Sequence, residues 1–179
     1  MLERENACLV IVDVQGKLAE LVYAKEELYK NLKILVSGAR VLGLPVLYME
    51  QYPKGLGHTI PELTTLLAEQ KPIIKNTFSA CGSLDFDRAL SEIGKSQVIL
   101  CGIETHVCVY QTCRDLLQQG FEVHLVIDAV SSRTEKNMKL GIACCRTLGA
   151  ILTGTEMLLF ELLEKSGTPE FKEISRLVK

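Results

Sequence analysis

Three side chains with complementary chemistry each lie just beyond an apolar stretch of the sequence. Asp13 follows residues 9–12, Lys75 follows residues 72–74, and Cys108 lies shortly after residues 98–101. In an open parallel sheet the carboxyl ends of the strands converge on one crevice, so we expect these three side chains to meet there. A thiol is a nucleophile, a carboxylate can move its proton, and an ammonium can stabilise the charge. The spacing therefore predicts that a nucleophile, a candidate base and a charge stabiliser meet in one crevice.

The local setting of Cys108 suggests how its thiol would be activated. The stretch that contains it reads Cys101-Gly102-Ile103-Glu104-Thr105-His106-Val107-Cys108. We interpret Thr105 as a helix N-cap, which places Cys108 in the first helical turn. The helix dipole and the free N–H groups there favour a thiolate. A Cys–His dyad with His106 is disfavoured, because residues two apart on a helix do not face each other.

Strand and helix patterns alternate along the whole chain. We expect strands at 8–12, 45–49, 72–74, 97–101, 122–127 and 150–153. We expect helices at 24–42, 61–69, 84–93, 105–119, 134–148, from 154 to 164, and at 169–177, with a loop at 51–60. This alternation predicts an α/β fold, a three-layer sandwich with a six-stranded parallel sheet of Rossmann-like type. One domain should span residues 1–179, with its crevice between the first and fourth strands.

Composition narrows the class of protein. The chain has 179 residues, 47% of them hydrophobic, and a formal net charge of −2. The basic residues are scattered, so we expect neither a nucleic-acid partner nor a membrane surface. No apolar run is long enough to cross a membrane, and no signal peptide is expected. Seven cysteines, an odd number, are typical of reduced thiols in a cytoplasmic setting.

Three motifs in order carry a family resemblance. They are Val12-Asp13-Val14-Gln15, Lys75-Asn76-Thr77-Phe78-Ser79, and Gly102 through Val109. Together they resemble the isochorismatase-like cysteine hydrolase family, over nearly the whole chain. The loop at 50–57 and the tail at 171–174 resemble the isochorismatase domain-containing proteins, including a group described as mitochondrial-associated and ribonuclease-like. A mitochondrial association would rest on that narrower resemblance alone.

The family resemblance implies roles for particular residues. The catalytic triad would be Asp13, Lys75 and Cys108. The peptide bond between Ile103 and Glu104 would be cis, and the backbone N–H groups of Glu104 and Cys108 would form an oxyanion hole. Four further side chains are candidates for the substrate pocket, each balanced between a pocket and a packing role: Gln15, Tyr52, Phe78 and Thr105. Ser79 is a fifth candidate, because it matches a serine common near the family's site; its alternative role is to cap the next helix.

One departure from the family concerns metal binding. Nicotinamidases bind a metal through an Asp-x-His pair after the second strand and a further histidine, whereas this chain has Glu50-Gln51-Tyr52 there and a lone His58. We therefore expect no metal and no other cofactor, and nicotinamide is disfavoured as the substrate. In many isochorismatases the cysteine is absent, so vinyl-ether hydrolysis is disfavoured too.

Several functions stay open from the sequence. The first is hydrolysis of a small molecule at an amide-type C–N bond. The second is a binding or scaffold protein on the same fold, since a fold does not determine a function. A ribonuclease is disfavoured, because there is no basic stripe and no histidine pair suited to phosphoryl chemistry. Apolar surface on the helix at 134–148 and on residues 156–163, together with the family resemblance, leads us to expect a homo-oligomer, a dimer, tetramer or larger.

Overall fold

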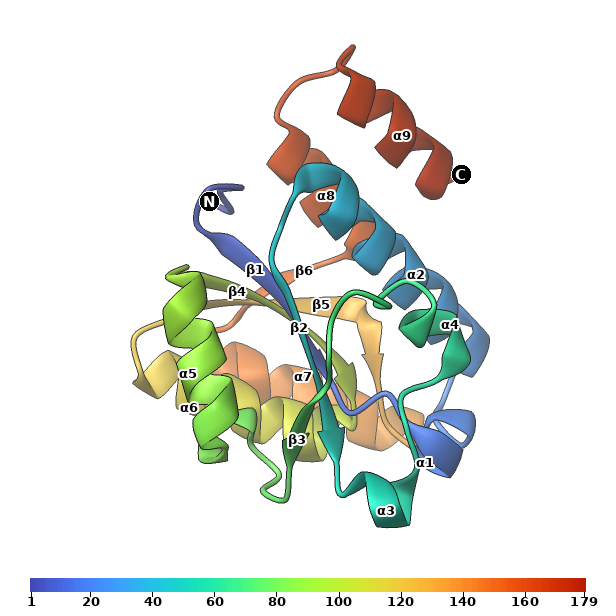
Figure 1. The fold of residues 1–179 in the computed structure, drawn as a ribbon, viewed down its shortest axis with the longest axis vertical. Helices are drawn as coiled ribbons and strands as arrows, with labels where there is room; N and C mark the ends of the chain where they lie inside the picture. Colours follow the sequence, from blue (N-terminus) through green and yellow to red (C-terminus); the bar gives the residue numbers. More distant parts are fainter.

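A single six-stranded sheet, all of whose strands are parallel, organises the molecule (Figure 1). The computed structural model describes all residues from 1 to 179. The strand order is β3-β2-β1-β4-β5-β6. The strands are β1 (Ala7–Val12), β2 (Val46–Gln51), β3 (Ile73–Lys75), β4 (Gln97–Ile103), β5 (Glu122–Ser131) and β6 (Ile151–Thr153). The α/β class and the parallel sheet expected from the alternating pattern are confirmed.

Helices cover both faces of this sheet, which is why its central strands are uniformly apolar. Every residue of β1 and of β4 is buried. One face carries α2 (Lys25–Leu42), α8 (Thr155–Leu163) and α9 (Pro169–Leu177), and the other carries α5 (Leu84–Ile93), α6 (Tyr110–Gln118) and α7 (Glu135–Thr147). The two faces hold separate cores of 30 and 18 buried residues. None of the helices combines the length and the apolar character needed to cross a membrane.

The strand order reverses at β1, because the chain moves outward from β1 to β2 and β3 and then returns to β4 on the other side. The crevice therefore opens where β1 and β4 end, as expected. Gly102, near the end of β4, pairs in register with Val12. Its φ is +113°, and a Cβ there would lie 2.2 Å from the carbonyl oxygen of Val12. Only glycine permits this close approach of the two strands at the mouth of the crevice.

The segment that carries Cys108 differs from expectation. The helix expected at 105–119 is divided into a π-helical turn, Thr105–Val109, and the α-helix α6 that follows it. The hydroxyl of Thr105 is buried and makes no hydrogen bond, so the interpretation of Thr105 as an N-cap is wrong. Tertiary contacts decide this segment: a Cβ at Gly141 of α7 would lie only 2.6 Å from the carbonyl carbon of Thr105. Because Gly141 has no side chain, the π-helical turn can pack directly against α7 at this position.

Short helices line the rim of the crevice at places where the sequence pattern was too brief to indicate them. These are α1 (Gly16–Glu20), which directly follows β1, and α3 (Pro53–Leu56), inside the loop expected at 51–60. The helix expected at 61–69 is limited to α4 (Pro61–Thr64). A further 3-10 turn, η1 (Ala80–Gly82), precedes α5.

Candidate active site

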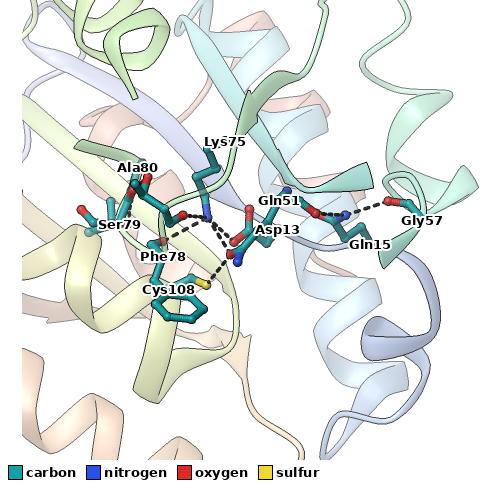
Figure 2. A network of polar contacts seen from close by, with 11 residues as sticks. Asp13, Gln15, Gln51, Gly57, Lys75, Phe78, Ser79, Ala80 and Cys108 are labelled. Carbon is teal, nitrogen blue, oxygen red and sulfur yellow. Dashed lines mark hydrogen bonds and ion pairs between the residues drawn. The ribbon is translucent and has the colours of Figure 1, made fainter. Parts of the chain in front are cut away.

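A buried ion pair joins the ends of β1 and β3. Lys75 Nζ lies 2.6 Å from Asp13 Oδ2, and both side chains are buried (Figure 2). The ammonium also donates to Gln51 Oε1 at 3.1 Å and to the carbonyl oxygens of Thr77 and Phe78, each at 3.0 Å. Three N–H groups thus serve four oxygen acceptors, and the Lys75 cation has no capacity left for another anion.

Cys108 joins the same network through Gln51. Its thiol donates to Gln51 Oε1 at 3.2 Å, the oxygen that also accepts from Lys75. Figure 2 shows the thiol, the ammonium and the Asp13 carboxylate gathered around this one amide. The structure therefore brings together the three side chains that the strand ends were expected to bring together. His106 lies elsewhere: its ring bonds to the hydroxyl of Ser132 at 3.0 Å, and not to the thiol.

The electrostatics of the thiol contradict the expectation of a favoured thiolate. Burial, together with the negative charge of Asp13, raises the pKa of Cys108 to about 12, although Lys75 acts in the opposite direction. Burial also raises the pKa of Asp13 above its ordinary value, against the lowering effect of the Lys75 charge. Desolvation thus outweighs the helix-terminus effect on which the expectation rested. The resting site holds a neutral thiol beside a carboxylate.

Glu104 combines a backbone feature with a side-chain feature at the mouth of β4. The peptide bond between Ile103 and Glu104 is cis. The backbone N–H of Glu104 donates to no protein group, whereas its carbonyl accepts from Val107 and Val109. Its carboxylate accepts two hydrogen bonds from Arg133, one from the backbone N–H and one from Nε, each at 3.0 Å. One free backbone N–H therefore lies beside the cavity of the thiol, where it can donate a hydrogen bond to an oxyanion.

A cavity of about 120 Å³ opens above the thiol. Its walls combine apolar side chains with the polar site residues: Asp13, Gln15, Leu18, Gln51, Leu56, Phe78, Ile103, Glu104, Val107 and Cys108. Lys75 lies behind this wall, buried with its ammonium against Asp13. Among the candidate pocket residues, Gln15 and Phe78 line the cavity. Tyr52, Ser79 and Thr105 do not.

The three candidates outside the cavity have packing roles or lie apart from it. Tyr52 is exposed, adopts a left-handed backbone with φ +40°, and packs its ring close over Gly55 of α3. Ser79 and Thr105 are buried, and neither hydroxyl has a hydrogen-bond partner. The side chains of Ser79 and Thr105 are therefore enclosed by the protein and do not face the cavity.

Gln51 is the functional candidate that the sequence reasoning missed. It ends β2 and pairs in register with Lys75 at the end of β3. Its backbone is fixed by Gln15, whose amide donates to the Gln51 carbonyl at 2.9 Å and accepts from its N–H at 2.7 Å. The same rule that identified Asp13 and Lys75, a polar residue at the end of a parallel strand, would have identified Gln51.

Residues 7–157 match the family model described as the isochorismatase domain. The chain belongs to the isochorismatase domain family. A curated relative is isochorismatase domain-containing protein 2 from Danio rerio, with 37% identity over 99% of this chain and 89% of the relative.

Two solved structures extend the comparison. The MAR1 ribonuclease from Caenorhabditis elegans shares 40% identity and a TM-score of 0.92, over 99% of this chain and 91% of that one. YcaC from Pseudomonas aeruginosa, solved with hexane-2,5-diol and covalent acrylamide, shares 28% identity and a TM-score of 0.90, over 97% and 89% of the two chains. The fold of this family member is therefore that of an isochorismatase-like hydrolase.

The position at which nicotinamidases of the wider family bind a metal has a structural role in this chain. The Glu50 carboxylate accepts from the backbone N–H of Thr59 at 2.7 Å and from the Thr59 hydroxyl at 2.9 Å, and it lies 3.0 Å from the ring of His58. Burial opposes ionisation of Glu50, but these hydrogen bonds prevail and lower its pKa. Glu50 thus ties the loop after α3 to the end of β2. No group of three or more His, Cys, Asp or Glu side chains is placed to hold a metal ion.

Proposed function

We propose that this isochorismatase-family protein is a cysteine hydrolase that cleaves the C–N bond of a small amide through a covalent intermediate on Cys108. One observation carries the proposal: the thiol of Cys108, the carboxylate of Asp13 and the ammonium of Lys75 meet around Gln51 at a cavity. A nucleophile, a proton carrier and a fixed cation are the groups that acyl transfer needs.

In the proposed first half-reaction, Asp13 takes the proton of the Cys108 thiol as the sulfur attacks the amide carbon. The carbonyl oxygen of the amide gains negative charge and accepts a hydrogen bond from the free backbone N–H of Glu104. Asp13 then gives its proton to the amide nitrogen, the C–N bond breaks, and ammonia leaves from a thioester. In the second half, Asp13 takes a proton from water, whose oxygen attacks the thioester. The acid is released and the thiol recovers its proton.

The electrostatics support this order of events. A thiol whose pKa is about 12 is neutral at rest, so its proton must be removed when the substrate is attacked. Asp13, whose pKa is raised by burial, is a stronger base than an exposed aspartate. Lys75 remains charged throughout and offsets the negative charge that moves between Asp13 and the sulfur. General acid–base transfer of this type contributes about 100- to 10,000-fold to a rate.

The comparison with YcaC adds support from chemistry, since its structure contains covalently bound acrylamide. A relative with the same fold therefore carries a nucleophile that adds to an activated alkene, which supports a reactive nucleophile and not amide cleavage itself. We extend that reactivity to Cys108 of this chain.

Ribonuclease activity, suggested by the name of the Caenorhabditis elegans structure, is less compatible with this site. A nucleotide is larger than a cavity of about 120 Å³. Its phosphate would also need a cation, and the Lys75 ammonium is already fully engaged. A protein that only binds a ligand would not require a base, Asp13, beside a thiol, Cys108, so the binding-protein alternative does not explain this arrangement.

The test is ammonia release from a panel of small primary amides by the wild-type protein and by Cys108→Ala. Cys144→Ala is the matched control, because Cys144 is a free, partly exposed cysteine on α7 that does not line the cavity. We expect release by the wild-type protein and the control, and none by Cys108→Ala with unchanged circular dichroism. Equal release by Cys108→Ala would contradict the proposal. Release from no amide by any variant would favour the binding-protein alternative.

We further propose that the chain self-associates through apolar side chains at the β6 edge of the sheet, on β6 itself and on α7 and α8, which lie on opposite faces of the sheet. Large apolar side chains are exposed there, among them Leu140, Leu148, Ile151 and Met157, with exposures between 41% and 64%. Burial of such surface is the usual driving force for oligomers. Light scattering should give at least a dimer at micromolar concentration, and a monomer would contradict the expectation.

A further inference from the structure

The cavity above Cys108 is small, and its volume limits the substrate. It measures about 120 Å³. An apolar cavity of about 150 Å³ in another protein accepts benzene, so this cavity, which is exposed at Leu56, suits a ligand of roughly five to seven non-hydrogen atoms. An amide group occupies three of these positions in any amide substrate. The remainder of the substrate is therefore a compact group of a few carbon atoms.

The wall of the cavity is apolar wherever it is not committed to catalysis. Leu18 and Leu56 come from α1 and α3, Phe78 from the loop after β3, and Val107 from the π-helical turn. Gln15 also lines the cavity, but its amide is already used to fix the backbone around it, with donation to the carbonyls of Gln51 and Gly57. These surfaces suit a hydrocarbon group and offer no polar partner for it.

The charges around the cavity select against an anionic substrate. Two carboxylates, Asp13 and Glu104, line it, and no cationic side chain does. Lys75 is buried behind Asp13 with all of its donors used. Arg133, the nearest cation at Glu104, is paired with that carboxylate. A carboxylate on the substrate would lose its hydration beside two carboxylates, and the cations that pair with these two line no part of the cavity.

Gln51 is the one polar side chain here with a donor to spare. Its Oε1 accepts from Lys75 and from the thiol, while its amide nitrogen donates to no protein group. A ligand in the cavity can accept from that nitrogen through a neutral carbonyl oxygen. Such an interaction recognises an uncharged amide, and it cannot neutralise an anion.

We propose that the substrate of this site is a small, uncharged primary amide with a compact apolar acyl group, and that a carboxylate on the acyl group excludes a substrate. This inference rests on the proposed amide hydrolysis and restricts it to one chemical class. Isobutyramide is a suitable first probe, since its branched acyl group matches both the size and the apolar wall.

The test compares malonamate with acetoacetamide, which match in size and differ in charge. We expect kcat/KM for the anion to be at least about 100-fold lower, equivalent to about 2.7 kcal/mol in the transition state. Benzamide should be cleaved far more slowly than isobutyramide, because its ring exceeds the cavity. Equal turnover of malonamate and acetoacetamide, lost in Cys108→Ala, would overturn the substrate class and leave amide hydrolysis intact.

A variant pair provides a gain of function. Leu56 lies at the exposed edge of the cavity, so Leu56→Lys adds a cation to the wall and Leu56→Gln adds a neutral polar group of lesser length. The lysine variant should raise the malonamate-to-acetoacetamide ratio of kcat/KM at least about tenfold over the glutamine variant. An unchanged ratio would show that charge in the cavity does not select the substrate.

A second readout does not depend on turnover. A compound that binds in the cavity should slow the alkylation of Cys108 by iodoacetamide, whether or not the compound is hydrolysed. We expect protection by acetoacetamide and not by malonamate at the same concentration. If neither amide is hydrolysed, the proposed function fails, and this protection pattern still decides whether the cavity selects against anions. Equal protection by the two compounds would overturn that selection.

Discussion

Replacement of Asp13 by Asn should abolish turnover and at the same time make the Cys108 thiol more acidic. The two effects have different causes. Turnover stops because asparagine cannot carry a proton, which costs about 100- to 10,000-fold. The thiol becomes more acidic because the negative charge of Asp13 raises its pKa, and that charge is gone in the variant. Lys75 then acts on the sulfur without the opposing charge of Asp13, although burial and the Glu104 charge still raise the thiol pKa. Gln51 and two carbonyl oxygens still hold the ammonium.

The size of the second effect follows from the geometry. The carboxylate and the thiol are connected through Lys75 and Gln51 by contacts of 2.6, 3.1 and 3.2 Å. For a separation of about 5 Å, taken as an order-of-magnitude value for side chains joined by this network, two unit charges interact by about 3 kcal/mol at an effective dielectric of 20. Half of that value, about 1.4 kcal/mol, corresponds to a tenfold change in the thiolate fraction. We therefore expect alkylation of Cys108 in Asp13→Asn to be at least about tenfold faster at pH 8.

The assay is peptide-resolved alkylation by limiting iodoacetamide, scored at all seven cysteines in the wild-type protein and in two variants. Lys75→Met is the counterpart of Asp13→Asn, because removal of the cation should slow alkylation of Cys108. It should also lower the free energy of unfolding by about 3–5 kcal/mol, since it leaves a buried carboxylate unpaired. Slower alkylation in Asp13→Asn would refute the reasoning on acidity, since removal of the thiol proton by Asp13 would then outweigh the effect of its negative charge on the thiol pKa.

Three further outcomes follow from the structure. Glu50→Gln should lower the free energy of unfolding by about 1–3 kcal/mol at pH 7 in urea denaturation, because the hydrogen bonds from Thr59 weaken. Since folding lowers the pKa of Glu50, the difference in unfolding free energy between the wild-type protein and Glu50→Gln should shrink as the pH falls through the folded pKa. A difference that stays constant with pH would contradict a lowered pKa of Glu50. Gly141→Ala should reduce kcat/KM at least about tenfold, because its methyl group displaces the Thr105 backbone; unchanged kinetics would contradict that contact. The acid limb of the pH–rate profile should have its midpoint above about 3.9, the ordinary aspartate value, because burial raises the pKa of Asp13; a midpoint below it would exclude Asp13 as the base.

The contribution of Asp13 to the unfolding free energy should depend on pH in the opposite direction to that of Glu50. A carboxyl group whose pKa is raised by folding favours the folded state at low pH, and this contribution is lost as the pH rises through the folded pKa. The unfolding free energy of the wild-type protein should therefore fall relative to that of Asp13→Asn as the pH rises from acid toward neutral. Urea denaturation at several pH values measures this difference. A trend of the opposite sign would show that Lys75 lowers the pKa of Asp13 by more than burial raises it.

Much of the architecture was predictable because it depends on local apolar pattern. Continuous apolar runs identified β1 and β4, the strands buried on both faces, and the alternation with helices identified the parallel sheet. The position of the crevice then followed from topology. Asp13, Lys75 and Cys108 could be expected together because the end of a parallel strand is a defined place in space.

The remaining features depend on contacts between segments far apart in the chain. The π-helical turn at Thr105–Val109 depends on the close approach of Gly141, which no pattern near Cys108 indicates. The acidity of the thiol was predicted with the wrong sign, because burial and the Asp13 charge are properties of the folded site. Ser79 and Thr105 lie in the recognised motifs, yet only the packing determines that their side chains face inward.

The most direct test of the central claim is mass spectrometry of the wild-type protein, acid-quenched during turnover of isobutyramide and digested with a protease. We expect the peptide that contains Cys108 to gain the mass of one isobutyryl group, in an amount that rises during turnover and disappears when the amide is exhausted. Turnover without any acyl adduct on that peptide, and undiminished in Cys108→Ala, would contradict a covalent mechanism at this cysteine.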